Sequence, residues 1–346
     1  MSDWIADPRI RWRILLTARL AAPLGPSEAD RLGERLQDLV SRHGWPDERP
    51  PARQVAMERA DDVDALRARL AEEDGTPVVV GMAGQHLVVS AHHAWVDGLG
   101  LLDVLAEVTG TDVSSGARGV SGRPRAGGFL GAAVRRLGEV AFTPPARLAL
   151  PGVAPAGGDA FAVASVPGHH GTARLVHAAS AGLVHHNRAA GRRTRHVAIA
   201  IGAARREETA PGTPRRIADR SELLRLRGVE DLDLAAIERL VREAPTQPPV
   251  EAGGSAGGRV VETALRVLAP RLGSSLLVSH LGQVQAPGVD DLAFHPVTAG
   301  GTGLSLGAVG IGERTVLGLR GRRSEWDDAS LTALLQTLTA SLTGTG

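Results

Sequence analysis

Two adjacent histidines in "SAHHAWVDGLG" (Ser90 to Gly100) are followed closely by an Asp-Gly pair, and these residue types can do proton chemistry. A histidine is the side chain best suited to accept a proton near neutral pH, because its unperturbed pKa is about 6.5. Asp97 can orient such a base or tie its loop down, and Gly98 permits a tight exit from the loop. The stretch therefore contains a candidate general base, either His92 or His93.

Two further histidine pairs occur, His169–His170 in "GHHG" and His185–His186 in "VHHN". The first follows a proline in a predicted loop with no acid beside it. The second falls on a predicted helix, where neighbouring residues face different directions; His186 is expected to be packed and His185 solvated. We interpret both pairs as structural. No His-Glu-x-x-His or similar ligand spacing is present, so no metal site is expected.

The elements that must position the candidate base follow from hydrophobic periodicity. Residues 77–91 predict two strands around a tight turn near Gly84, and the histidines stand at the end of the second strand. Residues 99–110 resume helical spacing behind the Asp-Gly pair. The candidate base therefore lies where the chain leaves a sheet and enters a helix.

The rest of the chain mixes strands and helices. Strands are expected at 10–17, 160–166, 195–206, 222–228 and 274–282 and in a hairpin at 302–321; helices are expected at 25–44, 61–75, 172–191, 231–244, 258–273 and 326–342. The first strand is predicted to be half-buried, because apolar residues at even positions alternate with Arg11, Arg13 and Thr17. Residues 205–216 are expected to form a loop, and Asp233 is predicted to cap a helix.

A division into two lobes is expected from length and composition. The chain has 346 residues, more than the roughly 250–300 at which a single core stops growing. The stretch 142–160 is rich in Pro and Gly and predicts a linker. We therefore expect an N-terminal lobe at 1–145, which carries the histidine motif, and a C-terminal lobe at 146–346. Both lobes are expected to be of mixed α/β class.

Bulk composition excludes several classes of partner. The 39 basic residues balance 38 acidic ones, and tyrosine is absent, so nothing favours binding to nucleic acid. A signal peptide is not expected, because acids and a proline precede the apolar run of "MSDWIADPRIRWRILL". A membrane span is not expected either, since no apolar stretch approaches about 18 residues. Cysteine is absent as well, which excludes disulfides and thiolate catalysis and is consistent with the cytoplasm, where we expect the protein.

The stretch "HHAWVDG" resembles the His-His-x-x-x-Asp-Gly signature of the chloramphenicol acetyltransferase-like superfamily. This superfamily includes nonribosomal peptide condensation domains, wax ester synthases and polyketide-associated acyltransferases. The hairpin ahead of the motif and the leucine-rich helix behind it agree with the resemblance. "RHVAIAIGAARR" and "LLVSHLGQV" are similar to strands of the family's second lobe, although His280 stands where relatives often carry asparagine.

The resemblance implies two lobes of this fold, each a mixed, largely antiparallel sheet flanked by helices, that face each other across a tunnel. A thioester donor on coenzyme A or an acyl or peptidyl carrier protein would enter from one side, and a small amine or alcohol acceptor from the other. No permanently bound cofactor is implied, because the donor is carried on phosphopantetheine. The activity implied is that of an ester- or amide-forming acyltransferase in specialised metabolism.

Carried over by position, the resemblance makes His93 the general base, while His92 shapes the loop. Asp97 would be structural and paired with an arginine, and the backbone N–H of Gly98 would help an oxyanion, a contribution of about 3–4 kcal/mol in other enzymes. Trp95 and Ser279 are expected to contact substrate. The candidate partners of Asp97 are Arg11, Arg13, Arg19, Arg205 and Arg206.

An alternative from another class remains open at this point. Some members of the superfamily have lost condensation chemistry and recruit a carrier protein or a partner enzyme, and others catalyse different reactions in natural-product pathways on the same scaffold. The short chain and the altered second-lobe motifs favour this reading, whereas the complete signature at His92, His93, Asp97 and Gly98 favours an enzyme. The two hypotheses differ in whether transfer occurs and depends on His93.

Overall fold

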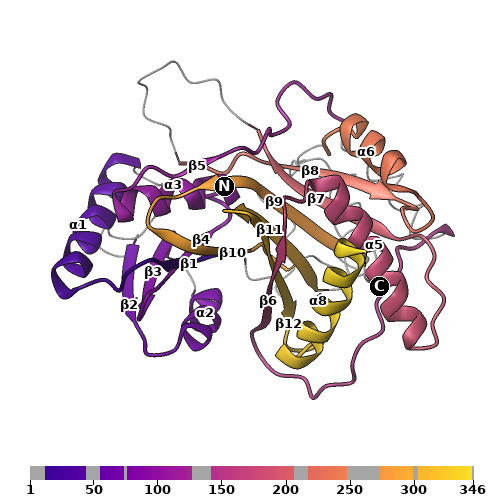
Figure 1. The fold of residues 1–346 in the computed structure, drawn as a ribbon, viewed down its shortest axis with the longest axis horizontal. Coiled ribbons are helices and arrows are strands. Elements are labelled where there is room, and N and C mark those ends of the chain that lie inside the picture. Colours follow the sequence, from indigo (N-terminus) through magenta and orange to yellow (C-terminus); the bar gives the residue numbers. More distant parts are fainter. Residues whose placement is uncertain are drawn as a thin grey trace, which may run out of the picture.

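The elements of the chain form two sheets with helices packed on them (Figure 1). A computed structural model describes residues 12–43, 55–73, 76–126, 142–205, 217–247, 273–298 and 303–344. The predicted helix at 258–273 and nearly all of the predicted loop at 205–216 lie outside the described residues. The other predicted strands and helices form close to their expected places.

The first sheet has the strand order β10-β1-β4-β3-β2. Its strands are β1 (Arg13–Leu20), β2 (Val55–Arg59), β3 (Val78–Ala83), β4 (His86–His92) and β10 (Val289–His295). Neighbouring strands are antiparallel except β2 and β3, which are parallel. The β3–β4 hairpin turns at Gly84, whose φ of 56° is a left-handed conformation that suits glycine. The predicted turn is confirmed.

The second sheet follows the order β6-β12-β11-β9-β7-β8, with β5 also paired to β9. Its strands are β5 (Ser114–Ser115), β6 (Asp159–Pro167), β7 (Ala198–Ala204), β8 (Ser221–Arg227), β9 (Leu276–Gln285), β11 (Leu304–Ile311) and β12 (Arg314–Arg322). The central strand β9 runs parallel to both β7 and β11, and the outer pairs are antiparallel. The expected mixed, largely antiparallel sheets flanked by helices are confirmed.

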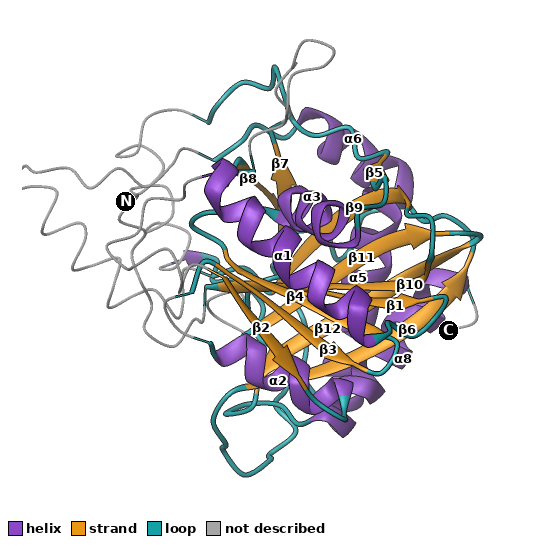
Figure 2. Cartoon of the chain, turned by 90° about the vertical axis from the view of Figure 1, so that its left-hand side faces the viewer, coloured by secondary structure: helices purple, strands orange, loops and turns teal. Residues whose placement is uncertain are grey.

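Helices pack on both sheets. The first sheet carries α1 (Pro26–His43), α2 (Val63–Glu72) and α3 (Gly98–Thr109), and the second carries α5 (Thr172–Ala189), α6 (Leu234–Glu243) and α8 (Asp328–Thr343). In Figure 2, α1 crosses in front of the strands of the first sheet. The Asp233 side chain caps α6 by accepting from the N–H of Ala236 at 2.8 Å, as predicted.

The strand β1 is buried on both faces, which corrects the prediction of a half-buried strand. Ile14 and Leu16 pack toward α1 and α3, while Leu15 packs with residues of α2 on the opposite face. Arg13, expected to face solvent, is only 1 % exposed. Its guanidinium donates to the Ser90 hydroxyl at 2.8 Å and to the Thr76 carbonyl at 2.6 Å, which satisfies the buried charge.

Two strands cross between the halves of the sequence. β10 comes from the second half yet pairs with β1, and β5 comes from the first half yet pairs with β9. Figure 1 shows the orange β9–β10 segment reaching toward the indigo strands. Neither crossing strand is among the predicted elements. The expected boundary at residue 145 therefore separates the two halves in sequence only. In the fold, each half contributes one strand that pairs with a strand of the other half.

A cluster of buried side chains also joins the halves, on the side of α2. Phe161 of β6 lies between two guanidiniums, with Arg67 Cζ 5.5 Å and Arg320 Cζ 5.6 Å from its ring centroid. Arg320 is fully buried; it donates to Asp159 Oδ2 at 2.5 and 2.8 Å and to the Arg13 carbonyl at 2.6 Å. We call this set the junction cluster; its members are Arg67, Asp159, Phe161, His295 and Arg320.

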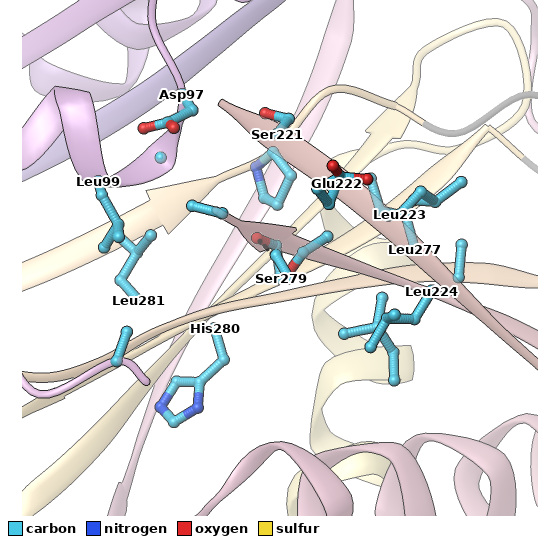
Figure 3. Close-up of a pocket in the computed structure, with 18 of the residues that line it drawn as sticks. Asp97, Leu99, Ser221, Glu222, Leu223, Leu224, Leu277, Ser279, His280 and Leu281 are labelled. Carbon is cyan, nitrogen blue, oxygen red and sulfur yellow. Dashed lines mark hydrogen bonds between the residues drawn. The ribbon is translucent and has the colours of Figure 1, made fainter. Parts of the chain in front are cut away.

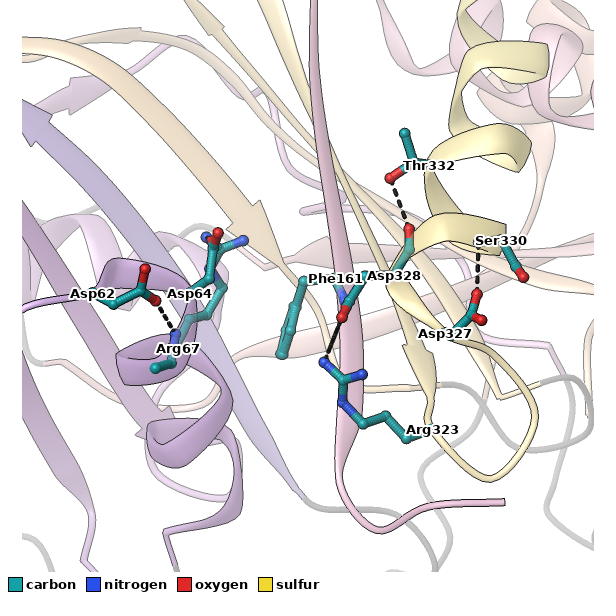
Figure 4. Close-up of polar contacts among 10 residues, drawn as sticks. Asp62, Asp64, Arg67, Phe161, Arg323, Asp327, Asp328, Ser330 and Thr332 are labelled. Carbon is teal, nitrogen blue, oxygen red and sulfur yellow. Dashed lines mark hydrogen bonds and ion pairs between the residues drawn. The ribbon is translucent and has the colours of Figure 1, made fainter. Parts of the chain in front are cut away.

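Hydrogen bonds at the start of α8 support the same region (Figure 4). The N–H of Phe161 donates to Asp328 Oδ1 at 3.0 Å, and Arg323 pairs with Asp328 at 2.7 Å. Asp327 caps the helix by accepting from the Ser330 N–H at 2.7 Å. The helix α8, which packs on the second sheet, is thereby tied to β6, the strand that carries Phe161.

No helix among the described residues has the length and apolar character needed to cross a bilayer.

Candidate active site

The histidine motif forms a tight turn between β4 and α3. His92 ends the strand and its N–H donates to the Pro77 carbonyl at 2.8 Å, while the N–H of His93 donates to the Trp12 carbonyl at 2.7 Å. Trp95 and Val96 both donate their N–H to the His92 carbonyl, at 3.0 and 3.3 Å. The backbone of both histidines is thus held by neighbouring strands and by the turn itself.

The two histidine side chains have different surroundings. The ring of His92 accepts from the N–H of Ala94 at 3.2 Å and lies 4.8 Å, centroid to centroid, from the Trp95 ring. His93 instead lies beside a carboxylate, with Nδ1 3.7 Å from Asp219 Oδ1. His92 is therefore engaged with its own turn, and His93 faces a residue from the other half of the chain.

Asp97 caps α3, and among the described residues no arginine side chain pairs with it, whereas the resemblance implies such a pair. Its carboxylate accepts from the N–H of Gly100 at 2.7 Å and from the N–H of Arg220 at 3.1 Å. Burial raises the pKa of Asp97, and these two hydrogen bonds act against that rise. The buried carboxylate is thus satisfied by backbone donors.

The arginines proposed as partners of Asp97 are engaged elsewhere or lie outside the described residues. Arg13 donates to Ser90 and Thr76, as described above. Arg19 lies 3.7 Å from Asp290 and Arg205 lies 2.7 Å from Glu222. Arg11 and Arg206 are not among the described residues.

Gly98 begins α3 at a point where the chain passes close to the second half. A Cβ placed on Gly98 would lie 2.8 Å from Leu281 Cδ2 and 3.2 Å from Phe294 Cζ. Both neighbours are buried. The glycine is therefore required by the close approach of two other side chains.

A cavity of about 1060 Å³ opens beside this turn. All six predicted site residues line it: His92, His93, Trp95, Asp97, Gly98 and Ser279. Residues of β7, β8 and β9 line it as well, and Figure 3 shows Leu223 and Leu224 of β8 and Leu277 of β9 on one side, with Leu281 of β9 beside Leu99 of α3. The leucines give the cavity an apolar side that suits an apolar group, and Glu222 and Arg225 of β8 line it as well.

Ser279 and His280 are among the polar residues of β9 that line the cavity. Ser279 lies opposite Gly202 in the β7–β9 register, and its hydroxyl is 3.5 Å from the Gly202 carbonyl. His280 Nδ1 lies 3.3 Å from the Thr172 hydroxyl, at the start of α5. Burial lowers the pKa of His280 to about 4, so its ring is neutral at neutral pH.

The other two histidine pairs lie in the environments predicted for them. His169 and His170 are in the loop after β6; His169 Nε2 lies 3.8 Å from Glu313, an acid distant in sequence. On α5, His185 is exposed, whereas His186 is bonded to the Ala149 carbonyl at 2.9 Å. None of these four residues lines the cavity. No group of three or more potential metal ligands occurs in the described part of the chain.

Asp219 is the main site residue that the sequence does not reveal. It precedes β8 in "IADRSELLRL", where no motif or spacing sets it apart from other acids. Its approach to His93 depends on how the second half docks on the first. The sequence also does not reveal the stretch 116–120 as part of the site. It lines the cavity, although its composition predicts only an irregular segment.

Comparison with known proteins finds relatives by structure only. No protein-family model and no curated protein matches the sequence. The first condensation domain of the calcium-dependent antibiotic synthetase, in complex with a substrate analogue, superposes with a TM-score of 0.55 at 17% identity, covering 97% of this chain and 92% of that chain.

Two further solved structures agree with this match. The starter condensation domain of rhizomide synthetase, in complex with C8-CoA, has a TM-score of 0.54 at 13% identity and covers 97% of this chain and 90% of its own. The wax ester synthase/diacylglycerol acyltransferase from Marinobacter aquaeolei VT8 has a TM-score of 0.52 at 14% identity, with 99% and 96% covered. At these identities the matches show the fold alone: over nearly its whole length the chain has the fold of these condensation domains and of the wax ester synthase.

Proposed function

We propose that this chain is a condensation-type acyltransferase, which moves an acyl or aminoacyl group from a thioester to an amine or an alcohol. The observation that carries the proposal is the position of His93. Its side chain lies on the wall of a large cavity between the two halves and is 20 % exposed, so a substrate can reach it. The fold, shared with condensation domains and a wax ester synthase, supports the same reaction class.

His93 acts as the general base in this proposal. The acceptor N–H or O–H gives its proton to the imidazole while the acceptor nitrogen or oxygen attacks the thioester carbonyl carbon. The C–S bond then breaks, and the leaving thiolate takes the proton back from the imidazolium. An amide or ester and a free thiol are formed, and His93 returns to its starting state without a covalent intermediate on the protein.

The neighbouring residues assist this step in different ways. Gly98 lies in the first turn of α3, where backbone N–H groups favour a negative charge, and its N–H is the proposed donor to the oxyanion. His92 and Asp97 hold the turn in shape through the contacts described above. Trp95 and Ser279 are the proposed substrate contacts, on opposite walls of the cavity.

The proposed donor is carried on phosphopantetheine, either in coenzyme A or on a carrier protein. Supporting this, one structural relative is described in complex with C8-CoA. The leucines of β8 and β9 that line the cavity suit an apolar acyl chain. The proposed acceptor is a small amine or alcohol.

Transfer is tested by mixing the protein with acyl-CoA or acyl-carrier donors and a panel of amines and alcohols, with products detected by mass spectrometry. We expect His93→Ala to reduce turnover about 100- to 10,000-fold, the range that general acid–base catalysis contributes. His185→Ala, on the exposed face of α5, is the matched control and should leave turnover unchanged. Turnover that survives His93→Ala would overturn the proposed base. Tight carrier binding without turnover on any donor would instead favour the recruiting role.

A further inference from the structure

We propose that Asp219 is the positioning residue of His93, and that the second half of the chain supplies it to the motif carried by the first half. In this arrangement Asp219 keeps the proton of the neutral imidazole on Nδ1. Nε2 is then left with a lone pair and takes the acceptor's proton. The inference deepens the proposed function and rests on His93 being the base.

The first support is the geometry of the pair. Asp219 Oδ1 lies 3.7 Å from His93 Nδ1, and the two side chains are 18 % and 20 % exposed. Within the described part of the chain, the buried Nδ1 has no hydrogen-bond partner. The separation is longer than a hydrogen bond, but catalytic contacts are often long without substrate and shorten when it binds. A carboxylate facing one ring nitrogen selects the tautomer with the proton on that nitrogen.

The second support is the way in which Asp219 is held. The segment Ile217–Ser221 comes from the second half of the chain but docks on the first half. Ile217 is 3 % exposed and packs in the core cluster of α1 and α3, and its N–H donates to His43 Nδ1 at 3.3 Å. The Asp219 carboxylate itself accepts from the N–H of Ser221 at 3.0 Å. The carboxylate therefore stands on a fixed segment.

The third support links Asp219 to the motif. Asp97 Oδ2 accepts from the N–H of Arg220, the residue next to Asp219, at 3.1 Å. The carbonyl of Arg220 accepts from the N–H of Arg205 at 2.9 Å, so the peptide chain here is held from both sides. Asp97 thus fixes the segment that carries Asp219.

The tautomer of His93 tests the inference without any substrate. The protein is labelled with ¹⁵N-histidine, and the His93 signals are assigned by their loss in His93→Gln. At a pH where the ring is neutral, we expect a pyrrole-type shift at Nδ1 and a pyridine-type shift at Nε2. In Asp219→Ala this preference should be lost, while the signals of the histidines far from the cavity stay in place and report an intact fold.

Two further variants make the result decisive. Asp219→Asn keeps the shape of the side chain and replaces Asp219→Ala if that variant does not fold; it should shift the tautomer balance in the same direction. Asp290→Asn, at a surface ion pair with Arg19, is the matched control and should leave His93 unchanged. An Nε2–H tautomer in the unmodified protein, or the same balance in the Asp219 variants, would overturn the inference.

Kinetics separate this inference from the proposed function. With an active donor and acceptor pair, Asp219→Asn should lower kcat about tenfold or more with little change in KM, less than the loss in His93→Ala. Asp219→Glu should recover part of the loss. If His93→Ala removes transfer but Asp219→Asn does not lower kcat, the positioning role is wrong and the base stands. If His93→Ala transfers normally, the proposed base is wrong whatever the tautomer, and if no donor and acceptor pair is turned over at all, the proposed function is wrong.

Discussion

His93 and His295 both lie where the two halves of the chain meet, but charges of opposite sign surround them. His93 is 20 % exposed, lines the cavity and faces the carboxylate of Asp219. His295 is fully buried in the junction cluster, edge-on to Phe161 with ring centroids 5.1 Å apart. Neither of its ring nitrogens has a hydrogen-bond partner among the described residues.

This difference in burial and neighbouring charge separates a histidine that a substrate can reach from one that serves only as packing. Burial lowers the pKa of His295 well below its ordinary value, and the positive charges of Arg67 and Arg320 lower it further. The ring therefore stays neutral and serves as packing. His93 instead lines the cavity beside the Asp219 carboxylate, so a substrate can reach its ring. Burial and local charge separate the two roles.

Removing Arg320 should have the largest effect on the junction side. Arg320→Ala leaves the Asp159 carboxylate buried without its partner and removes the donor to the Arg13 carbonyl. We expect a loss of about 3–5 kcal/mol in the free energy of unfolding. The measurement is urea denaturation followed by circular dichroism.

Arg323→Ala is the matched control for this variant. Arg323 pairs with Asp328 near the surface, with 31 % of its side chain exposed. Exposed pairs contribute about 0–1 kcal/mol, so the expected change is small. Equal losses in the two arginine variants would show that the junction cluster is not the stabilising contact described above.

A smaller loss is expected on the cavity side from Gly98→Ala. The new methyl group meets Leu281 and Phe294, and overpacking of this kind costs about 1–3 kcal/mol. Leu281→Ala in the same chain makes room for it. The double variant should therefore be less destabilised than the sum of the two single variants. Simple additivity in urea denaturation would contradict the close approach.

The smallest effect concerns the dependence of stability on pH. In the unfolded chain His295 takes up a proton as the pH falls through about 6.5, whereas the folded protein keeps the ring neutral. The unfolded state then binds more protons, so the free energy of unfolding falls by about 1.4 kcal/mol per pH unit below that value. His280, with a pKa of about 4, adds to the fall over the same range.

Comparison with His295→Leu isolates this contribution. Between pH 6 and pH 5 the slope should be shallower in the variant by about 1.4 kcal/mol per pH unit. The opposing contribution of Asp97, whose pKa burial raises, is present in both proteins and cancels in the difference. Parallel slopes in the two proteins would mean that His295 titrates in the folded state.

Much of the fold could be predicted from local pattern. The helix at α1, the turn at Gly84 and the closing helix α8 follow from periodicity and turn residues within short windows. β10 was missed because "VDDLAFH" places two acids in a short strand at the edge of the sheet. The burial of Arg13 was also missed, since its partners Ser90 and Thr76 are distant in sequence.

In the candidate site, too, the local part could be predicted from the sequence and the part that depends on distant contacts could not. The turn from His92 to Gly98 is local, so one short motif was enough to indicate it. Asp219 and the backbone partner of Asp97 are brought in by the docking of the second half, and no spacing in one sequence records that. The sequence therefore predicts the base, and only the fold shows the carboxylate beside it.

The pairing of β10 with β1 has a consequence for the order in which the protein assembles. During synthesis the N-terminal strands emerge first, but β1 can complete its hydrogen bonds only after β6 to β9 have followed. Until then one edge of β1 exposes unpaired N–H and C=O groups, which favour association with other chains. Pairing over such a distance in sequence also slows folding. A fragment that stops at residue 145 would keep that open edge permanently.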